Sequence, residues 1–303
     1  MSALSVGAPT RRRRRRSSDL RAALVFLLPA GAGFVVFYAW PAIRTFYLSF
    51  TDYSLLAPPE WAGLDNYRHA LTDATLLNAI EVTLEYVVIN IGVQTLVALA
   101  MAVLMHRLTR SSVIRGALLL PYLIANVVVA LLWFAMLDAQ LGIVNAMLGW
   151  VGVDPVAFFG ETSTAIPTIA LINVWRHMGY TALLLFAGLQ AIPGSVYEAA
   201  AIDGAGELRI FRRITWPLLR PVIALVLVLT VIGSFQIFDT VAVTTKGGPI
   251  NATRVIYYYI YERAFQQFDF GYAAALCVIL FAILATVALV QIRLLRAGES
   301  DLG

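Results

Sequence analysis

An arginine and a histidine stand near the middle of a long apolar segment. Arg176 and His177 interrupt the stretch 166–191, and Asn173 and Tyr180 fall on the same helical face as Arg176. A cation at the centre of a membrane-spanning helix is costly and usually faces a bundle interior or a water-filled cavity. Sugars are bound by such sets, because amides, guanidinium groups and hydroxyls hydrogen-bond the ring oxygens and aromatic faces stack on the ring. These four residues are the first candidates for a solute site.

The same residues also have structural interpretations. Arg176 could pair with Asp239, with Glu85 or with a backbone carbonyl, and His177 could be an interior histidine whose hydrogen bonds are satisfied. A cation facing the pathway would instead favour an anionic or phosphate-bearing solute. Three further amides in apolar segments are expected to join helices by hydrogen bonds and not to bind solute: Asn90, Gln94 and Asn126.

The sequence lacks the residue patterns of an enzyme. No GxxxxGK[ST] loop occurs, and the only lysine, Lys246, is followed by Gly-Gly-Pro. No HExxH motif, Cys/His metal set or nucleophile and base pair is present. The lone Cys277 excludes an internal disulfide and is expected to be a small buried hydrophobe. We therefore expect no catalysis, metal or cofactor on this chain.

Composition predicts a membrane protein. The 303 residues are 60% hydrophobic and 13% charged, against roughly 45–50% and about 25% in soluble domains. Helices that use lipid as solvent can expose such residues without penalty. Six apolar segments approach the roughly 17–25 residues of a spanning helix: 22–43, 86–105, 116–137, 166–191, 221–238 and 270–292. The predicted fold class is an all-α integral membrane protein with six transmembrane helices.

The arginines predict the orientation of these helices. They collect at 11–21, 107–115, 209–220 and 293–296, whereas the alternate loops are acidic or mixed. By the positive-inside rule both termini are cytoplasmic. Residues 1–21 carry seven Arg and one Asp, and the rest of the chain carries 15 basic and 17 acidic residues. The basic excess is thus a tail and does not indicate nucleic-acid binding.

The chain divides into a tail at 1–21 and a membrane domain at 22–303. The tail, with its arginine run at 11–16, is expected to be disordered and held near anionic headgroups. A signal peptide is the competing interpretation of this end, because Ala30-Gly31-Ala32 resembles a cleavage site. The apolar run continues past that point to Trp40-Pro41, so an uncleaved first helix is favoured.

A loop at 191–221, between the fourth and fifth predicted spans, carries ordered signals. Pro193 and Gly194 stop the preceding helix, and Ser195 precedes Glu198 by three residues, which is the spacing of a capping box. A short helix is expected to begin there and to end at Gly204, a typical C′ residue. The small side chains of this helix would let another surface approach closely: Ala199, Ala200 and Ala201.

A second amphipathic stretch follows in the same loop. Its apolar residues are Leu208, Phe211 and Ile214, and Pro217 is expected to end it. The adjacent arginines fit a face that lies on the cytoplasmic membrane surface, and this is favoured over a partner site: Arg209, Arg212 and Arg213.

At these residues the chain resembles the permease subunits of binding-protein-dependent ABC importers. Their cytoplasmic loop has the pattern E-A-A, three residues, G, nine residues, I-x-L-P, and Trp216 here replaces the usual Leu. The pattern falls on Glu198, Ala199, Ala200, Gly204, Ile214 and Pro217. The resemblance implies a coupling helix seated in a groove of a cytoplasmic ATPase. It implies these coupling residues: Glu198, Ala199, Ala200, Asp203 and Gly204.

The resemblance narrows to the carbohydrate-uptake branch, of the maltose and glycerol-phosphate permease type. It covers about residues 24–293 through the segments WPAIRTFYLSFTDY, GLDNY, LLLPYL, TTKGGP and FDFGYAAA. It implies a substrate site made of Asn173, Arg176, His177, Tyr180, Thr230, Gly233, Ser234 and Ile237. Arg176 and His177 replace small or apolar family residues, and Ser234 replaces an amide, so the solute is expected to differ from maltose.

The resemblance also implies partners and a mechanism. A homologous second permease, as a heterodimer, two ATPase subunits carrying ATP and Mg, and an extracytoplasmic solute-binding protein would complete an importer in the bacterial inner membrane. ATP would drive alternating access for a sugar, such as an oligosaccharide or a related polyol or glycoside. A phosphate-bearing solute such as a glycerophosphodiester is the alternative. An ion-coupled secondary transporter and a non-transporting scaffold or sensor are remoter, because the spans are nearly free of acids and no large soluble domain is apparent.

Overall fold

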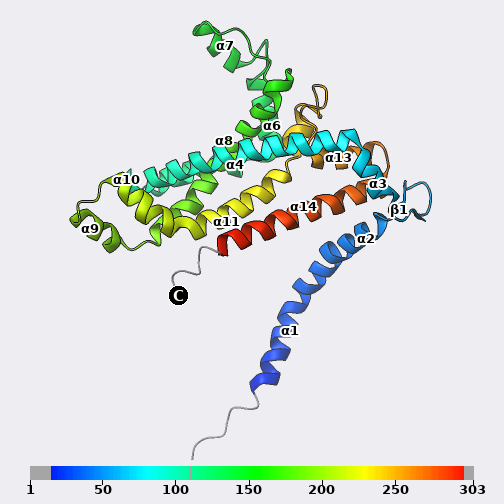
Figure 1. Cartoon of the computed structure of the whole chain (residues 1–303), viewed down its shortest axis with the longest axis horizontal. Coiled ribbons are helices and arrows are strands. Elements are labelled where there is room, and N and C mark those ends of the chain that lie inside the picture. Colours follow the sequence, from blue (N-terminus) through cyan, green and yellow to red (C-terminus); the bar gives the residue numbers. More distant parts are fainter. Residues whose placement is uncertain (1–14, 109–110, 297–303) are drawn as a thin grey trace, which may run out of the picture.

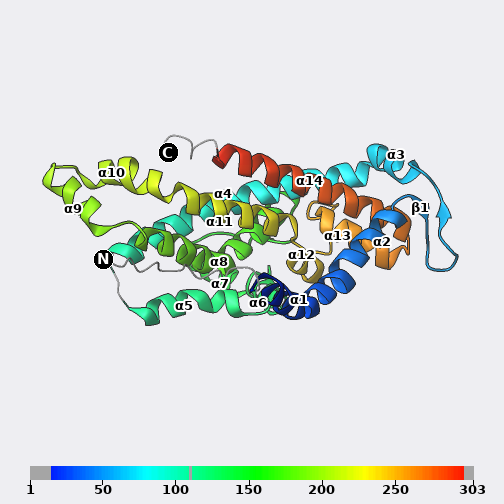
Figure 2. The same cartoon turned by 90° about the horizontal axis from the view of Figure 1, so that it is seen from below.

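The computed structural model describes residues 15–108 and 111–296. Most of the long helices run side by side, with α9 and α10 at one end and β1 and α3 at the other (Figure 1, and Figure 2 from below), whereas α1 points away from them (Figure 1). We call these the α9 end and the β1 end. The long helices are α1 (Arg15–Phe34), continued through the π-helix η1 (Val35–Ala39) into α2 (Trp40–Leu48), and α4 (Ala74–Leu108), α8 (Thr162–Gln190), α11 (Trp216–Phe235) and α14 (Phe270–Arg296).

Shorter elements connect and cover them. At the β1 end, β1 (Thr51–Asp52) pairs antiparallel with β2 (Glu60–Trp61), and α3 (Asp65–Thr72) follows. The remaining elements are α5 (Ser112–Leu123), α6 (Asn126–Met136), α7 (Ile143–Trp150), α9 (Gly194–Ile202), α10 (Glu207–Ile210), η2 (Phe211–Thr215), α12 (Asp239–Val243), α13 (Ile256–Tyr261) and η3 (Glu262–Gln266). Residues 15–21, expected to belong to a disordered tail, are already helical, and residues 1–14, with most of the arginine run, lie outside the described residues.

In the described part of the chain, five helices are long and apolar enough to cross a membrane, or six if one bent pair counts as a span. The single span predicted at 116–137 corresponds to this bent pair, α5 and α6, whose axes form a bend of 88°. Ile124 and Ala125 adopt extended backbone angles there and interrupt the helix. The second span is longer than predicted, because α4 starts at Ala74 and keeps Glu81 and Glu85 on its exposed side.

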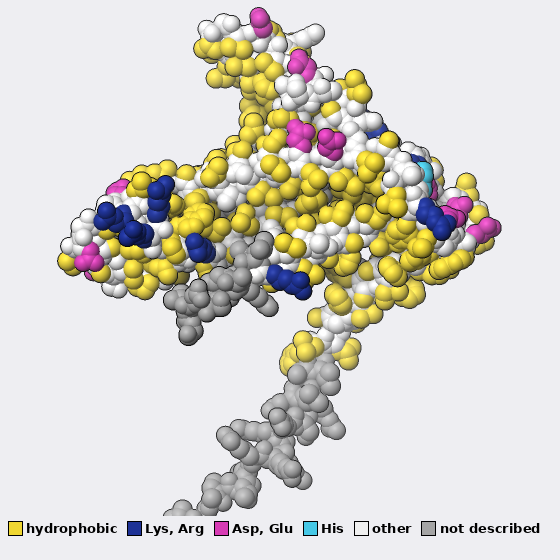
Figure 3. Space-filling view, viewed as in Figure 1, with side chains coloured by type: hydrophobic (Ala, Val, Ile, Leu, Met, Phe, Trp, Pro, Cys, Tyr) yellow, Lys and Arg dark blue, Asp and Glu magenta, His cyan; other side chains and the backbone are white. Residues whose placement is uncertain are grey.

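The centre of the bundle is the contact between α4 and α8, with α5 and α11 packed on α8. Gly179 of α8 allows the closest approach, because a Cβ there would meet the carbonyl oxygen of Leu118 in α5 at 1.8 Å. By contrast, no residue in the segment Val25–Leu48 is fully buried within this chain: α1 points away from the bundle (Figure 1), whereas α2 packs against α14. Apolar side chains cover much of the surface between the two ends, as in a protein solvated by lipid (Figure 3).

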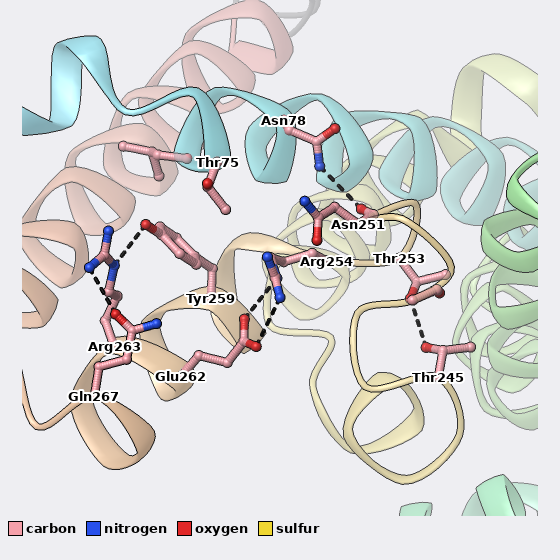
Figure 4. A network of polar contacts seen from close by, with 12 residues as sticks. Thr75, Asn78, Thr245, Asn251, Thr253, Arg254, Tyr259, Glu262, Arg263 and Gln267 are labelled. Carbon is pink, nitrogen blue, oxygen red and sulfur yellow. Dashed lines mark hydrogen bonds and ion pairs between the residues drawn. The ribbon is translucent and has the colours of Figure 1, made fainter.

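A polar network joins three helices at the β1 end. The buried Asp73 carboxylate accepts hydrogen bonds from the hydroxyls of Tyr259 and Tyr272, and Arg263 donates to the Tyr259 hydroxyl at 2.8 Å. Nearby, Arg254 forms an ion pair with Glu262 at 2.8 Å (Figure 4). These contacts tie the start of α4 to α13, η3 and the start of α14.

Candidate functional site

A cavity of about 210 Å³ lies between α4, α8 and two places where helices are interrupted. One interruption is the α5–α6 bend, and the other is the stretch 236–238 between α11 and α12. Broken helices expose polar backbone groups at membrane depth, and they are tolerated where they line a cavity. The cavity is therefore placed where solute sites occur in membrane transporters.

Seven of the eight residues predicted for the substrate site line this cavity. Those from α8 are Asn173, His177 and Tyr180, and those from α11 and the segment after it are Thr230, Gly233, Ser234 and Ile237. The eighth, Arg176, is not among the lining residues.

Arg176 instead binds backbone carbonyls at the α5–α6 bend. Its Nε and Nη2 donate to the carbonyl of Ile124 at 3.2 and 3.0 Å, and Nη2 also donates to that of Tyr122 at 3.1 Å. The last carbonyls of α5 have no amide donors further along a helix. The guanidinium supplies these donors, which matches the backbone-carbonyl interpretation of this residue.

His177 is held in one tautomer by its neighbours. Its Nε2 lies 2.9 Å from Arg176 Nη1, and its Nδ1 lies 3.0 Å from the carbonyl oxygen of Asn173. Because a guanidinium only donates, Nε2 accepts and Nδ1 carries the proton. The histidine is thus both satisfied and part of the cavity wall.

A chain of amides and hydroxyls links three helices along the wall. Asn173 of α8 donates to Asn90 of α4 at 3.0 Å, and Asn90 donates to Ser234 of α11 at 2.8 Å. Gln94 accepts from Asn90 at 3.2 Å and donates to Thr181 at 2.8 Å. The prediction that Asn90 and Gln94 join helices is confirmed, and both also line the cavity.

The helix interruptions supply lining residues that were not predicted to line the cavity, although the prediction that Asn126 joins helices is confirmed. Tyr122, at the end of α5, stacks on Tyr180 with ring centroids 4.5 Å apart. Asn126, at the start of α6, donates to Asp239 at 2.8 Å, and both residues line the cavity. From the sequence, Asp239 was considered only as a possible ion-pair partner of Arg176. It lies directly after the fifth apolar segment and was therefore not counted among the residues inside a span.

The cavity combines hydroxyls, amides, one carboxylate and a stacked tyrosine pair. Such a wall suits a solute that carries many hydrogen-bonding groups and one apolar face. Among the described residues, no group of three or more His, Cys, Asp or Glu side chains is placed to hold a metal ion.

The predicted helix in the loop 191–221 is α9. It begins at Gly194, with Pro193 at the N-cap position and no side-chain capping bond, so the predicted Ser195 capping box is wrong. Ser195 lies inside the first turn, two residues after the N-cap position. The other end is as predicted: Gly204 has a φ of +69°, and the amides of Gly204 and Ala205 donate to the carbonyls of Ala201 and Ala200.

Most of the predicted coupling residues are exposed on α9. Glu198, Ala199, Asp203 and Gly204 are exposed, whereas Ala200 is only 8% exposed and faces the chain itself. The small residues available to a partner are therefore Ala199 and Ala201. Beside them, the exposed arginines of α10 and η2 gather in a basic cluster (Figure 3): Arg209, Arg212 and Arg213.

Two contacts attach this end to the bundle. Tyr197 of α9 packs near the ring of His106 in α4, with centroids 6.1 Å apart, and its hydroxyl lies 3.3 Å from that of Thr215 in η2. Arg107 of α4 forms an ion pair with Glu207 of α10 at 2.6 Å. These contacts connect α9, α10 and η2 to the end of α4.

The prediction that Pro217 ends the second amphipathic stretch is wrong. The helix continues from α10 through η2 into α11, and Pro217 lies in the first turn of α11. In η2 the amide of Trp216 bonds the carbonyl of Phe211, five residues back. This wider π-helical turn comes directly before Pro217. The proline, which has no N–H to donate, therefore stands where the backbone hydrogen bonds change from five-residue to four-residue spacing.

Comparisons with known proteins agree with this architecture. The sequence profile of the family described as "Binding-protein-dependent transport system inner membrane component" matches residues 94–298. The probable ABC transporter permease protein YesP of Bacillus subtilis is 34% identical over 278 residues, which are 90% of this chain and 89% of that protein. The trehalose/maltose transport system permease protein MalF of Thermococcus litoralis is 31% identical, over 90% of this chain and 92% of that protein.

A solved structure shares the fold. It is a bacterial ABC transporter involved in the import of the acidic polysaccharide alginate, and one of its chains superposes with a TM-score of 0.81 at 25% identity, covering 94% of this chain and 99% of that chain.

This chain belongs to the family of inner-membrane components of binding-protein-dependent transport systems. It is an all-α, multi-pass membrane permease of the ABC type, a transport component and not an enzyme.

Proposed function

We propose that the chain is the permease subunit of an ATP-driven importer that moves a sugar delivered by an extracytoplasmic solute-binding protein. The observation that carries this proposal is the cavity at the interrupted helices, whose wall holds seven of the predicted solute-binding residues. Their amides and hydroxyls are already ordered by bonds between helices. Such ordering lowers the entropic cost of binding a flexible polyol.

Two observations support a sugar over a phosphodiester. Relatives of this chain are named for the transport of trehalose or maltose, of starch degradation products and of alginate, and these sugar transporters stand beside one relative that is named for sn-glycerol-3-phosphate transport. In addition, the guanidinium that would recognise a phosphate, that of Arg176, is engaged with carbonyls of the α5–α6 bend.

The remaining subunits are part of the same proposal. A homologous second permease would complete the pathway as a heterodimer, and two ATPase subunits would hold ATP and Mg²⁺ and receive α9. In this arrangement the α9 end and both termini face the bacterial cytoplasm, where the exposed arginines beside α9 satisfy the positive-inside rule. Closure of the ATPases on ATP would displace α9 and switch the side to which the cavity opens.

Purification in mild detergent tests the assembly and the solute class together. We expect a second permease and an ATPase to copurify, and we expect sugars presented by the binding protein to stimulate ATP hydrolysis. A panel of oligosaccharides, polyols and glycerophosphodiesters identifies the class. Stimulation by phosphodiesters and by no sugar would contradict the proposed substrate, and uptake that persists without an ATPase would contradict the mechanism.

A further inference from the structure

The cavity wall contains one carboxylate and no guanidinium or ammonium group. Among the described residues that line it, Asp239 is the only Asp or Glu, and none is Lys or Arg. Asp239 is half-buried, so its side chain keeps contact with water. Among the described lining residues, the acidic group that a solute meets inside the cavity is therefore this carboxylate.

The position of this carboxylate is fixed from across the cavity. Its Oδ2 accepts a hydrogen bond from Asn126 Nδ2 at 2.8 Å, which joins the start of α12 to the start of α6. The carboxylate is thus held between the two helix interruptions that shape the cavity.

The neighbouring cationic and titratable groups do not replace this negative charge. Arg176 is close enough to Asp239 for their charges to interact, but its guanidinium binds two carbonyls of the α5–α6 bend and does not line the wall. His177 accepts a hydrogen bond from Arg176 at Nε2, and protonation of that nitrogen would break the bond. Within the lining of the cavity, an anionic group therefore meets the Asp239 carboxylate and no guanidinium or ammonium group.

We propose that Asp239 makes the cavity selective for neutral sugars over sugars that carry carboxylate or phosphate groups. The inference rests on the proposed function, and it concerns which members of the sugar class are moved. A carboxylate accepts hydrogen bonds from sugar hydroxyls, whereas it repels a uronate at short range. This chain would thus differ from its structural relative, which takes part in the import of the acidic polysaccharide alginate.

The test is equilibrium binding to the purified permease and ATPase complex in nanodiscs, without the binding protein, so that the selectivity of that protein does not enter. The probes are maltotriose, which is neutral, and trigalacturonate, which is acidic. The wild-type complex should prefer maltotriose. Asp239→Asn should lower this preference about fivefold or more, because like charges a few ångströms apart repel by at least about 1 kcal/mol.

Two further variants separate charge from shape. Asp239→Glu keeps the charge and should keep the preference for maltotriose even if both affinities fall. Glu85→Gln removes a carboxylate from the exposed side of α4, outside the cavity, and should leave the preference unchanged.

Three outcomes would overturn the proposal. They are a wild-type preference for trigalacturonate, an unchanged preference for maltotriose in Asp239→Asn, and a preference for maltotriose that falls equally in Asp239→Asn and Asp239→Glu. Absence of binding by either probe, while binding-protein-dependent transport of a non-sugar is observed, would instead refute the proposed function and this inference with it.

Discussion

Single side chains in this protein decide whether an interrupted helix is stable. The α5–α6 bend leaves the carbonyls of Tyr122 and Ile124 without helical partners, and Arg176 donates to both from α8. A buried acceptor that loses its partner costs free energy comparable to a hydrogen bond. At this scale Arg176 is a positioning residue, because it orients the segment that presents Tyr122 and Asn126 to the cavity.

Truncating this side chain should therefore weaken the fold. Arg176→Ala should destabilise the protein by about 2 kcal/mol and lower uptake, and Arg176→Lys should restore part of the loss, since an ammonium reaches fewer acceptors. Thermal unfolding in detergent, measured beside uptake, checks both effects. The exposed Arg209→Ala serves as the control. Altered solute selectivity with unchanged stability would show that Arg176 contacts the solute instead.

At the scale of elements, two groups of contacts connect the ends of the helices. At the α9 end, Tyr197 links α9 to α4 and η2. At the β1 end, Asp73 links α4 to α13 and α14. The first is placed to transmit motion, and the second is placed to resist it, because it is buried and has several hydrogen-bond donors.

Tyr197→Ala should separate ATP hydrolysis from transport. Without the ring between α9 and His106, α9 can still dock, but its displacement no longer reaches α4 in full. We expect basal ATPase activity to persist and solute-stimulated activity to fall several-fold. Tyr197→Phe, which loses only a 3.3 Å hydroxyl contact, should behave almost like the wild type. Full stimulation in Tyr197→Ala would place the transmission elsewhere.

The Asp73 network should give acid-sensitive stability. Burial raises the pKa of Asp73, but hydrogen bonds from Tyr259, Tyr272 and the amides of Leu76 and Thr75 outweigh it, so that the pKa lies below its usual 3.8. Burial, together with Asp73, raises the pKa of Tyr259 to about 12, so this hydroxyl remains a donor. A carboxyl with a lowered folded pKa contributes stability above its unfolded pKa, and this contribution is lost as the pH falls through the folded pKa.

Unfolding temperatures measured from pH 7 down to pH 3 check whether Asp73 contributes this acid-sensitive stability. The wild type should lose stability below about pH 4. Asp73→Asn should be less stable at pH 7 by about 1–3 kcal/mol and should lose less on acidification. Equal acid sensitivity in the two proteins would assign the effect to other carboxylates.

At the scale of the whole molecule, the chain is one subunit of a multi-subunit transport system. The exposed α9 residues that are predicted to dock an ATPase, and the segment Val25–Leu48, are surfaces that a single chain leaves uncovered. Glu198→Lys should abolish copurification of the ATPase while leaving membrane insertion intact, because it reverses a charge on the exposed face of α9. Immunodetection of the ATPase after affinity purification measures this, with Ser195→Ala as a matched exposed control. Normal complex yield and uptake would contradict the assignment.

Much of this architecture was predictable, because apolar runs, arginine clusters and the Glu198 to Gly204 pattern are local signals. The face of Asn173, His177 and Tyr180 was predictable from helical periodicity. The turn of Arg176 away from the cavity was not, because a long side chain can reach either a pathway or a carbonyl from the same helical position. Tyr122 and Asn126 were missed as lining residues, because the interruption at Ile124 and Ala125 has no glycine and depends on a donor from another helix. Asp239 was missed because the other interruption, at 236–238, contains neither glycine nor proline.

The contact between α5 and α8 constrains how the transporter can move. Gly179 admits the Leu118 backbone at one point, and Arg176 holds the carbonyls at the bend about one turn away along α8. Two attachments on one pair of helices oppose sliding and rotation between them. We therefore expect a switch between inward and outward openings to carry α5 and α8 together, with its hinges where this pair meets the rest of the bundle.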